Sequence, residues 1–580
     1  MNELVFGTLA TPELRLAYAR QRQQGVSHHN QRQPWVPEPG ERPMLKVTIE
    51  EKVAIEKVVC HITEPEKRTV LLDRVDTNWD LFNWTYYQTW QGQLPAYDEG
   101  RVVRYHILAH PADGSPPIPA DNGQNFSYLV REISPPDWSY EAVIYQVFPD
   151  RFAVGHDQQW RDTDDLTAIH GGTLAGIIEK LDYIADLGFN CIWLNPFFPD
   201  TTHHGYHATD YFAVNPRLGN MDDLRRLLNE AHGRGIRIIL DFVANHWGSG
   251  HFSFQHARQH EDSPYHNWYH WDQWPDEYET FFGVKDLPTI NVDHPEARAY
   301  LLKAAHFWLT EFDFDGYRLD YAYGPSHDFW ADFFATVKVA NPDAWVFGEV
   351  VETPNKQLSY LGYFDGCLDF MLLQIMRHTF AQRRRTLVEF DSFLTQHERF
   401  FPPNFSQPCF LDNHDMNRFI WLADGDSRIL KVAATCQFTL PGQPIVYYGT
   451  EVGISQDLSI QPPDNGGMEQ ARKRMVWSEE GQDRELHAFY KRLIAFRRDN
   501  PVLVYGQRCT LYVSDETKTY VYSRYDETTR LIIFLSLSDK EEKVLIADQL
   551  FTLPPYAALI WNQDNNCLYN IANGDITETT

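Results

Sequence analysis

Short apolar runs and amphipathic stretches alternate through the middle of the chain. Eight apolar runs have the length of buried strands, and the stretches between them repeat their apolar residues at helical spacing. The runs are Ala142–Phe148, Cys191–Asn195, Ile236–Phe242, Gly316–Asp320, Ala344–Glu349, Cys367–Phe370, Pro408–Leu411 and Pro444–Tyr448. The helical stretches include Leu174–Leu187, Asp222–Arg234, Pro295–Glu311 and Ser427–Thr439. Eight β/α units of this kind predict an α/β fold, a (β/α)8 TIM barrel over residues 135–499.

One connection of the predicted barrel is much longer than the others. It follows the third strand, runs from about His246 to His294, and is dense in His, Trp, Tyr and Asp. Loops of this length are usually functional. We therefore expect an inserted domain at about 247–294, placed over the mouth of the barrel at the carboxyl ends of its strands.

Alternating apolar and polar residues return on both sides of the barrel. They predict an N-terminal β-sandwich over 43–134, preceded by a polar extension at 1–42, and a C-terminal antiparallel β-sandwich over 500–580. Trp79, Trp84 and Trp90 lie close together in the first sandwich. These tryptophans could fill the core of the sandwich and form one platform at its edge, or they could form a carbohydrate-binding surface. The pattern leaves both interpretations open.

Composition and charge narrow the class of protein. The 580 residues carry 51 basic and 80 acidic side chains, a formal charge of −29, which argues against a nucleic-acid or anionic-membrane partner. The seven cysteines are spread singly and in odd number, which favours free thiols over a disulfide framework. The N-terminus has no signal-peptide pattern, and no run approaches a membrane span. We expect a cytoplasmic protein.

Polar residues cluster where four of the predicted strands end. The strand ends read DFVANH (Asp241–His246), GYRLD (Gly316–Asp320), WVFGE (Trp345–Glu349) and CFLDNHD (Cys409–Asp415). One buried carboxylate could be explained as a helix cap, but four strand ends together indicate a polar catalytic mouth, since uncompensated buried charge is costly.

Glycoside cleavage needs such a set of carboxylates. One must stay ionised to attack the anomeric carbon, and another must hold a proton for the leaving oxygen. Arg318 lies two residues before Asp320 and so shares its strand face, where it should lower the pKa of that carboxyl. Glu349 ends an apolar strand, where partial burial should raise its pKa towards the acid role.

These four strand ends resemble the short conserved regions of the α-amylase family of glycoside hydrolases. GYHATDYFAVNPRLG from Gly205 and LPTIN from Leu287 resemble two further family segments. IYQVFPDRF and HGGTLAGI resemble the branch of neopullulanases, cyclomaltodextrinases and maltogenic amylases. The resemblance is ordered along the chain and spans about residues 141–480.

The resemblance implies a role for each matching residue. Three carboxyls match the catalytic set: Asp320 the nucleophile, Glu349 the general acid/base, and Asp415 the third carboxylate, which grips sugar hydroxyls. The matching substrate-binding residues are Arg318 beside the nucleophile, His246 and His414 on sugar hydroxyls, Tyr206 as a stacking platform, and Asp241 as a structural acid beneath the site. Tyr321 and Tyr323, which follow the nucleophile, complete the predicted substrate-binding set.

The chain departs from the family pattern after the nucleophile. Tyr323 and Gly324 stand where typical α-amylases have Lys-His and neopullulanase-like members have Asn-Glu, residues that help to define the acceptor side or a calcium site. Asn245 matches a calcium-ligating asparagine, but calcium takes 6–8 oxygen ligands. We therefore predict no required cofactor, with calcium unsupported by a full ligand set. Asp464 and Asn465 fit either a loop near the donor sugar or a plain turn.

The resulting expectation is a retaining α-glucan hydrolase acting on α-1,4 bonds, with α-1,6 bonds left open, of maltodextrins, cyclodextrins or pullulan. A transglycosylase or isomerase acting on α-glucosides shares the first half-reaction and stays open. A non-catalytic amylase-like binding protein would have lost part of the carboxylate set. An aldolase-type barrel would need a lysine at a strand end, which the strand ends above lack. The resemblance also leaves a homodimer open.

Overall fold

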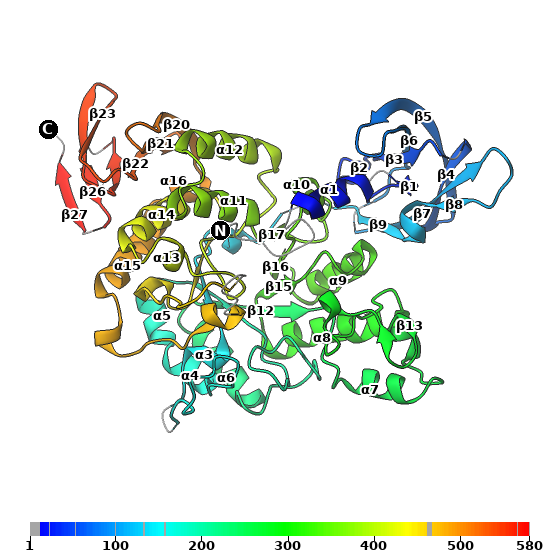
Figure 1. The fold of residues 1–580 in the computed structure, drawn as a ribbon, viewed down its shortest axis with the longest axis horizontal. Coiled ribbons are helices and arrows are strands. Elements are labelled where there is room, and N and C mark those ends of the chain that lie inside the picture. The colour runs from blue at the N-terminus through cyan, green and yellow to red at the C-terminus, as the bar shows by residue number, and fades with distance from the viewer. Residues whose placement is uncertain are drawn as a thin grey trace.

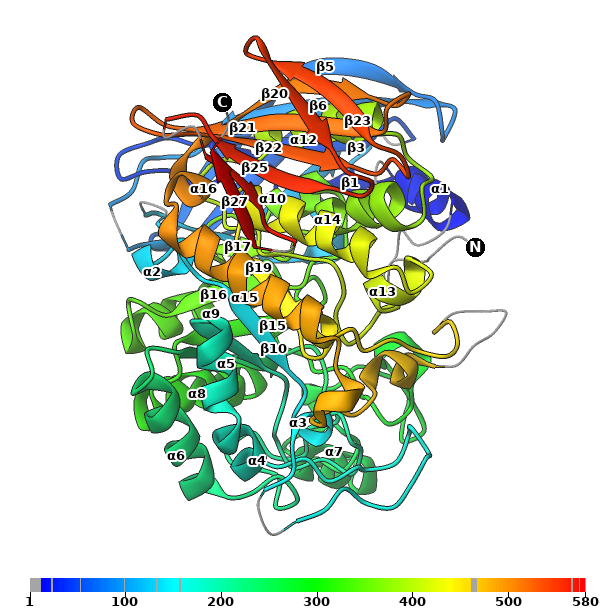
Figure 2. The same ribbon diagram turned by 90° about the vertical axis from the view of Figure 1, so that its left-hand side faces the viewer.

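The chain forms a central barrel that carries an antiparallel sheet at each end of the sequence. The computed structural model describes residues 12–578, except 22–23, 53, 99, 132–133, 156–157, 461–466, 565–566 and 573. Figure 1 shows the N-terminal sheet in blue and the C-terminal sheet in orange to red, apart from each other on the two sides of the barrel helices. Figure 2 views the same arrangement from the side that carries the C-terminal sheet.

The barrel has all eight predicted strands, and their neighbours are parallel. In spatial order they are β17 (Gly366–Cys367), β16 (Trp345–Gly348), β15 (Gly316–Asp320), β12 (Arg237–Val243), β11 (Cys191–Leu194), β10 (Ile144–Val147), β19 (Pro444–Tyr447) and β18 (Cys409–Phe410). The amide of Cys367 donates to the carbonyl of Ser406, and that of Asp369 to the carbonyl of Pro408. These bonds link the two outer strands and bring the eight strand ends to one mouth.

The four predicted helices form where the apolar spacing places them. α6 (Met221–His232) and α8 (Pro295–Phe312) each bury one face, whereas α14 (Ser427–Thr439) is buried on nearly all sides. Local signals explain their starts, because Asn220 forms a capping box and α8 begins with proline. The stretch from Leu174 is split into α4 (Leu174–Glu179) and α5 (Leu181–Leu187).

The N-terminal sheet is continuous and folds back on itself. Its longer strands are β3 (Met44–Glu50), β4 (Ile55–Glu64), β5 (Arg68–Asp80), β6 (Thr85–Gln93) and β7 (Val102–Pro111). β5 pairs with β4 at one end and β6 at the other, so it joins the two layers around one apolar core. β1 (Val26–Ser27) and β2 (Arg32–Gln33) also pair with β3. Part of the predicted extension therefore belongs to this sheet. The sequence does not predict β1 and β2, because strands of two residues have no alternating pattern.

The C-terminal part has a six-stranded sheet and a separate hairpin. The sheet contains β20 (Gln507–Ser514), β21 (Thr519–Tyr525), β22 (Arg530–Ser536), β25 (Ala558–Asn562), β26 (Cys567–Asn570) and β27 (Asp575–Glu578). The hairpin of β23 (Glu542–Ile546) and β24 (Gln549–Leu553) covers it, with Phe551 packed against Phe534 and Trp561. This packing makes the predicted antiparallel sandwich.

The long connection after β12 contains small elements of its own. It holds α7 (Phe252–Gln259) and a short hairpin of β13 (Trp271–Gln273) and β14 (Glu277–Tyr278). A single turn of 3-10 helix, Phe281–Gly283, then leads back towards the barrel mouth. These elements place aromatic side chains beside the strand ends.

Two expectations from composition can be compared with the structure. All seven cysteines are free thiols, and Cys60, Cys191, Cys367, Cys409 and Cys436 are buried. Within the residues that the structure describes, no helix has both the length and the apolar character needed to cross a bilayer.

Candidate active site

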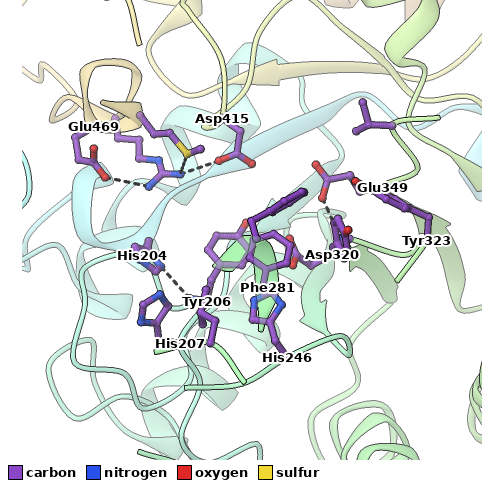
Figure 3. A pocket seen from close by; sticks show the side chains of 16 residues that line it. His204, Tyr206, His207, His246, Phe281, Asp320, Tyr323, Glu349, Asp415 and Glu469 are labelled. Carbon is purple, nitrogen blue, oxygen red and sulfur yellow. Dashed lines mark hydrogen bonds and ion pairs between the residues drawn. The ribbon is translucent and has the colours of Figure 1, made fainter. Parts of the chain in front are cut away.

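A cavity of about 250 Å³ opens at the carboxyl ends of the barrel strands. Figure 3 shows Asp320, Glu349 and Asp415 pointing into it from three different elements. Its other lining residues are His204, Tyr206, His207, His246, Phe281, Phe282, Leu287, Tyr321, Tyr323, Val351, Met468, Glu469 and Arg472. Of the ten residues predicted for catalysis and substrate binding, seven line this cavity, and Asp241, Arg318 and His414 lie buried beneath it.

Arg318 joins three of the carboxylates beneath the cavity. Its Nη1 donates to Asp241 Oδ1 at 2.7 Å and to Asp320 Oδ1 at 2.9 Å. Its Nη2 forms an ion pair with Glu349 Oε2 at 2.7 Å. Strand pairing explains this convergence, because Arg318 is the register partner of Asp241 on β12 and of Phe347 on β16. One fully buried guanidinium thus fixes the nucleophile and acid candidates relative to each other.

Asp415 is held by a second cation. Arg472 Nη2 donates to its Oδ1 at 2.7 Å, and His414 Nε2 lies 3.0 Å from its Oδ2. The Gln146 amide nitrogen lies 2.8 Å from His414 Nδ1 and can only donate there. His414 therefore carries its proton on Nε2, which faces Asp415. Burial alone would raise the pKa of Asp415, but His414, Arg472 and Arg318 together lower it.

Asp241 lies at the base of a buried hydrogen-bond network. Its Oδ2 accepts from Trp193 Nε1 at 3.0 Å and from the Tyr206 hydroxyl at 2.9 Å. Tyr206 in turn lies 2.6 Å from His414 Nε2, and its ring is parallel to the imidazole. These contacts lock Tyr206 in the wall of the cavity. We use the name carboxylate floor for Asp241, Asp320, Glu349 and Asp415.

Burial changes the expected protonation of the floor. Burial raises the pKa of Asp320 well above its ordinary value, and the nearby Glu349 charge adds to this, while Arg318 opposes it. Burial also raises the pKa of Glu349, again against Arg318. Arg318 lowers the pKa of Asp320 as its position predicts, but desolvation and the neighbouring carboxylates outweigh the guanidinium, so the net shift of this pKa is upward.

The charges of the floor support a retained proton. Its four carboxyls face two guanidiniums, those of Arg318 and Arg472, so full ionisation would leave a buried excess of negative charge. Protonating one carboxyl reduces that excess. A retaining pair needs one protonated carboxyl as the acid and one ionised carboxyl as the nucleophile, so one retained proton suits this chemistry.

The two histidines predicted for the site are neutral. Burial lowers the pKa of His246 and of His414 to about 3. The ring of His246 stacks on Phe281 at 4.4 Å, and its Nδ1 lies 3.2 Å from the Asn245 amide. Neutral imidazoles can donate and accept hydrogen bonds without adding charge, which suits contacts with sugar hydroxyls.

Four aromatic residues form one edge of the cavity, which we call the aromatic rim: Phe281, Phe282, Tyr321 and Tyr323. Their rings contact in sequence, with centroid distances of 4.6 Å for Phe281–Phe282, 4.7 Å for Phe281–Tyr321 and 4.1 Å for Tyr321–Tyr323. Phe282 and Tyr321 have left-handed backbone angles, φ 48° and 42°, and Phe282 is 54% exposed. Bulky residues in this conformation store strain, which is often found at functional sites.

Comparison with known proteins places this arrangement in a family. A sequence profile described as the catalytic domain of alpha amylase matches residues 146–506. The chain belongs to the α-amylase family. It is 39% identical to alpha-amylase 2 of Dictyoglomus thermophilum over 407 residues, 70% of this chain and 71% of that protein. It is 34% identical to a cyclomaltodextrinase of Thermoanaerobacter pseudethanolicus over 428 residues, covering 71% and 72%.

Solved structures of α-amylase-family enzymes agree with the fold. A cyclomaltodextrinase superposes with a TM-score of 0.68 at 28% identity, over 90% of this chain and 92% of that one. The cyclic alpha-maltosyl-(1→6)-maltose hydrolase of Arthrobacter globiformis, also at 0.68 and 28%, covers 74% of this chain and 99% of that one. The chain is thus a glycoside hydrolase of the cyclomaltodextrinase and neopullulanase branch.

Asn245, which matches a calcium-ligating asparagine of the family, is buried. The Asn245 side chain faces His246 and lies against Gly324, where an added Cβ would come within 2.1 Å of its Oδ1. Among the described residues, no three His, Cys, Asp or Glu side chains are gathered as a metal would require. Asp464 and Asn465 lie outside the described residues.

Several residues of this α-amylase-family site carry no signal in the sequence. Arg472 belongs to a basic run, ARKRM, that reads as a solvated surface, yet it is buried against Asp415. Phe281 and Phe282 are two aromatics in a segment already rich in them. Gln146 and Asn195 are single polar residues in or beside apolar strands. Only their position near the carboxyl ends of those strands could have suggested that they contact site residues.

Proposed function

We propose that this enzyme hydrolyses α-1,4-glucosidic bonds of maltodextrins or cyclodextrins, and α-1,6 bonds of pullulan where the cavity admits them, with retention at the anomeric carbon. The observation that carries the proposal is the shared guanidinium of Arg318, which holds Asp320 and Glu349 at one cavity. Retaining glycosidases need two carboxyls close together, about 5–5.5 Å apart, and the contacts of both Asp320 and Glu349 with one guanidinium support such a close pair. Relatives named cyclomaltodextrinase and neopullulanase support the substrate class.

In the first step Asp320 acts as the nucleophile and Glu349 as the acid. An oxygen of Asp320 forms a bond to the anomeric carbon while the bond to the glycosidic oxygen breaks. Glu349 gives its proton to that oxygen, which leaves as a sugar hydroxyl. Because Glu349 then becomes an anion beside Arg318, the guanidinium stabilises the charge that the step creates.

In the second step water replaces the leaving sugar. Glu349, now a carboxylate, takes a proton from the water, whose oxygen bonds to the anomeric carbon and releases Asp320. Two displacements at one carbon restore the α-configuration. Asp415, kept ionised by Arg472, and the neutral His246 and His414 are placed to hold sugar hydroxyls.

A substrate panel tests the proposal. The enzyme is incubated with maltoheptaose, β-cyclodextrin, pullulan, starch and trehalose, and products are followed over time by chromatography and proton NMR. We expect α-configured maltose or short maltodextrins from the first substrates. A product that is β-configured at early times contradicts retention, and no product from any substrate contradicts the proposed function.

A transglycosylase is the second candidate, and the aromatic rim favours it. Four adjoining rings beside Glu349 could hold a sugar acceptor and exclude water from the glycosyl-enzyme. The same time course separates the two functions. Products longer than the substrate identify transfer, whereas products that only shorten identify hydrolysis.

A further inference from the structure

The aromatic rim borders a second and larger hollow. This hollow measures about 600 Å³, within the range of about 300–1,000 Å³ that is usual for ligand pockets. It shares Phe281, Phe282, Tyr321 and Tyr323 with the catalytic cavity, so the two spaces adjoin at the rim. We call it the sandwich-side cleft, because its far wall is residues 121–124 of the N-terminal sheet.

We propose that the sandwich-side cleft binds the reducing-end portion of an α-glucan, the part that leaves in the first step. The 121–124 loop then belongs to the substrate site of its own chain. This inference rests on the proposed function and adds to it a preference for substrates with long leaving groups.

The position of Glu349 gives the direction of the bound glucan. The acid must face the leaving oxygen, so the leaving sugar lies on the Glu349 side of the cavity. Figure 3 shows Tyr323 beside Glu349, and His204 and Glu469 at the opposite side. The amide of Tyr321 donates to Glu349 Oε2 at 3.1 Å, which fixes the rim next to the acid. A chain that continues past the acid therefore crosses the rim and enters the sandwich-side cleft.

The lining of the cleft suits a polyhydroxy chain, and its charged members are Asp121, Glu279, Asp293 and Lys356. Amides, a hydroxyl and an imidazole face it from three separate parts of the protein: Asn122 and Gln124, Asn291, Ser326 and His270. Such groups donate and accept hydrogen bonds, as sugar hydroxyls require. The rim adds aromatic faces at the entrance, which suits the apolar faces of sugar rings.

The loop of the N-terminal sheet is held in position before any ligand binds. Asp121 accepts hydrogen bonds from the amides of His28 at 3.2 Å and His29 at 2.6 Å. Asp121 and Asn122 have left-handed backbone angles, φ 46° and 59°, so the loop is locked in an uncommon turn. A preformed wall loses little conformational freedom when a ligand binds.

The N-terminal sheet is also fixed to the barrel beneath the cleft. Arg104 of β7 donates to Asp328 Oδ1 at 2.7 Å and pairs with Asp332, both on α9 (His327–Ala340). Arg298 of α8 binds the same two carboxylates at 2.9 and 2.8 Å. Asn30 adds a bond to the Tyr363 hydroxyl at 3.0 Å. This partly buried network keeps the 121–124 loop opposite the inserted segment.

Chain-length kinetics of a loop variant test the inference. The double variant Asn122→Ala/Gln124→Ala removes two side chains that face the cleft, the first of them exposed, and leaves Asp121 in place. We measure kcat/KM for maltoheptaose and for para-nitrophenyl α-maltoside, whose small leaving group ends at the rim. The ratio of the two values should fall about five-fold, the effect of losing one hydrogen bond to a sugar hydroxyl, chiefly through KM.

A blocking variant and a control complete the test. Gln124→Trp should lower the same ratio further by filling the cleft, whereas Gln563→Ala, exposed on the C-terminal sheet, should leave it unchanged. An unchanged ratio in both loop variants, with wild-type thermal midpoints, overturns the inference. If the wild-type enzyme cleaves neither substrate, the proposed function itself fails, and the inference fails with it.

Discussion

The carboxylate floor and the aromatic rim border the same cavity but are built differently. The floor stands on four barrel strand ends and is held by two buried guanidiniums, with contacts of 2.7–2.9 Å to Asp241, Asp320, Glu349 and Asp415. The rim stands on two loops, contacts itself through ring edges, and includes two residues in the left-handed region. The floor is therefore fixed by charge and by sheet register, whereas the rim is fixed by local packing.

This difference assigns bond cleavage to the floor and the choice of substrate to the rim. Bond breaking needs carboxyls held to within fractions of an ångström, which strand ends and shared ion pairs provide. The choice of sugar depends on loop side chains, which can vary without moving the strands. Variants in the floor should change the rate of the chemical step, and variants in the rim should change which substrate is used.

The largest expected effect is that of Asp320→Asn in the floor. Turnover of maltoheptaose should fall about 10⁴-fold or more, since the amide cannot form the glycosyl-enzyme. The folded structure should persist, because asparagine is neutral and nearly isosteric. Turnover is measured by product release and folding by circular dichroism. Asp182→Asn, 84% exposed at its side chain, is the matched control; near-normal turnover in Asp320→Asn would end the assignment.

A smaller loss of activity, with a shifted pH profile, is expected for Arg472→Met. Arg472 helps to lower the pKa of Asp415, so its removal should raise that pKa. If ionised Asp415 is needed, activity on the acid side is then lost at higher pH than in the wild type. We expect kcat to fall about 10²-fold and the acid limb of kcat/KM to move upward. An acid limb that stays in place would mean that Asp415 does not control it.

The rim should respond in binding more than in rate. Tyr323→Ala removes one face beside Glu349, and we expect KM for maltoheptaose to rise about ten-fold while kcat changes less, since aromatic contacts contribute about 0.5–1.5 kcal/mol. The share of transfer products should change in parallel. Tyr505→Ala, an exposed tyrosine outside the cavity, serves as the control. A loss confined to kcat would place Tyr323 in the chemical step and blur the distinction between floor and rim.

The smallest effect concerns stability and pH. The folded pKa of Asp320 is raised, so between the ordinary carboxyl pKa and the folded value the native state binds more protons than the unfolded state, and stability falls as pH rises. Asp320→Asn removes this dependence. Its thermal midpoint should equal that of the wild type at acid pH and exceed it increasingly as pH rises, by about 1–3 °C at the top of the measured range. A gap that shrinks as pH rises would contradict the raised pKa.

The sequence predicts the fold well because apolar runs mark the barrel strands and helical spacing of apolar residues marks the helices between them. Each of the eight strands of the barrel coincides with an apolar run, since strands buried on both faces are continuously hydrophobic. The sequence could not reveal β1 and β2, which are two residues long and owe their pairing to β3. The sequence also could not show that the N-terminal sandwich is one continuous sheet. Nothing in the pattern of β5 indicates that its two ends pair in different layers.

The site was predicted in part, for a related reason. Asp241, Arg318, Asp320, Glu349 and Asp415 stand at or beside strand ends, whose convergence follows from the fold. Arg472 and Phe281 reach the cavity from distant loops, and no periodicity indicates where a loop returns. The net rise in the pKa of Asp320 could not be predicted, because burial and the neighbouring carboxylates, which outweigh Arg318, are properties of the assembled site.

The contacts of Glu349 have a consequence for the path of its proton. Arg318 Nη2 and the amide of Tyr321 both engage Oε2, and a hydrogen on that oxygen would point at groups that already carry hydrogens. An acidic hydrogen on Glu349 therefore fits Oε1 better than Oε2. The glutamic acid is thus a one-sided donor whose orientation is set by the backbone beside the nucleophile, and a glycosidic oxygen can be protonated from one direction only.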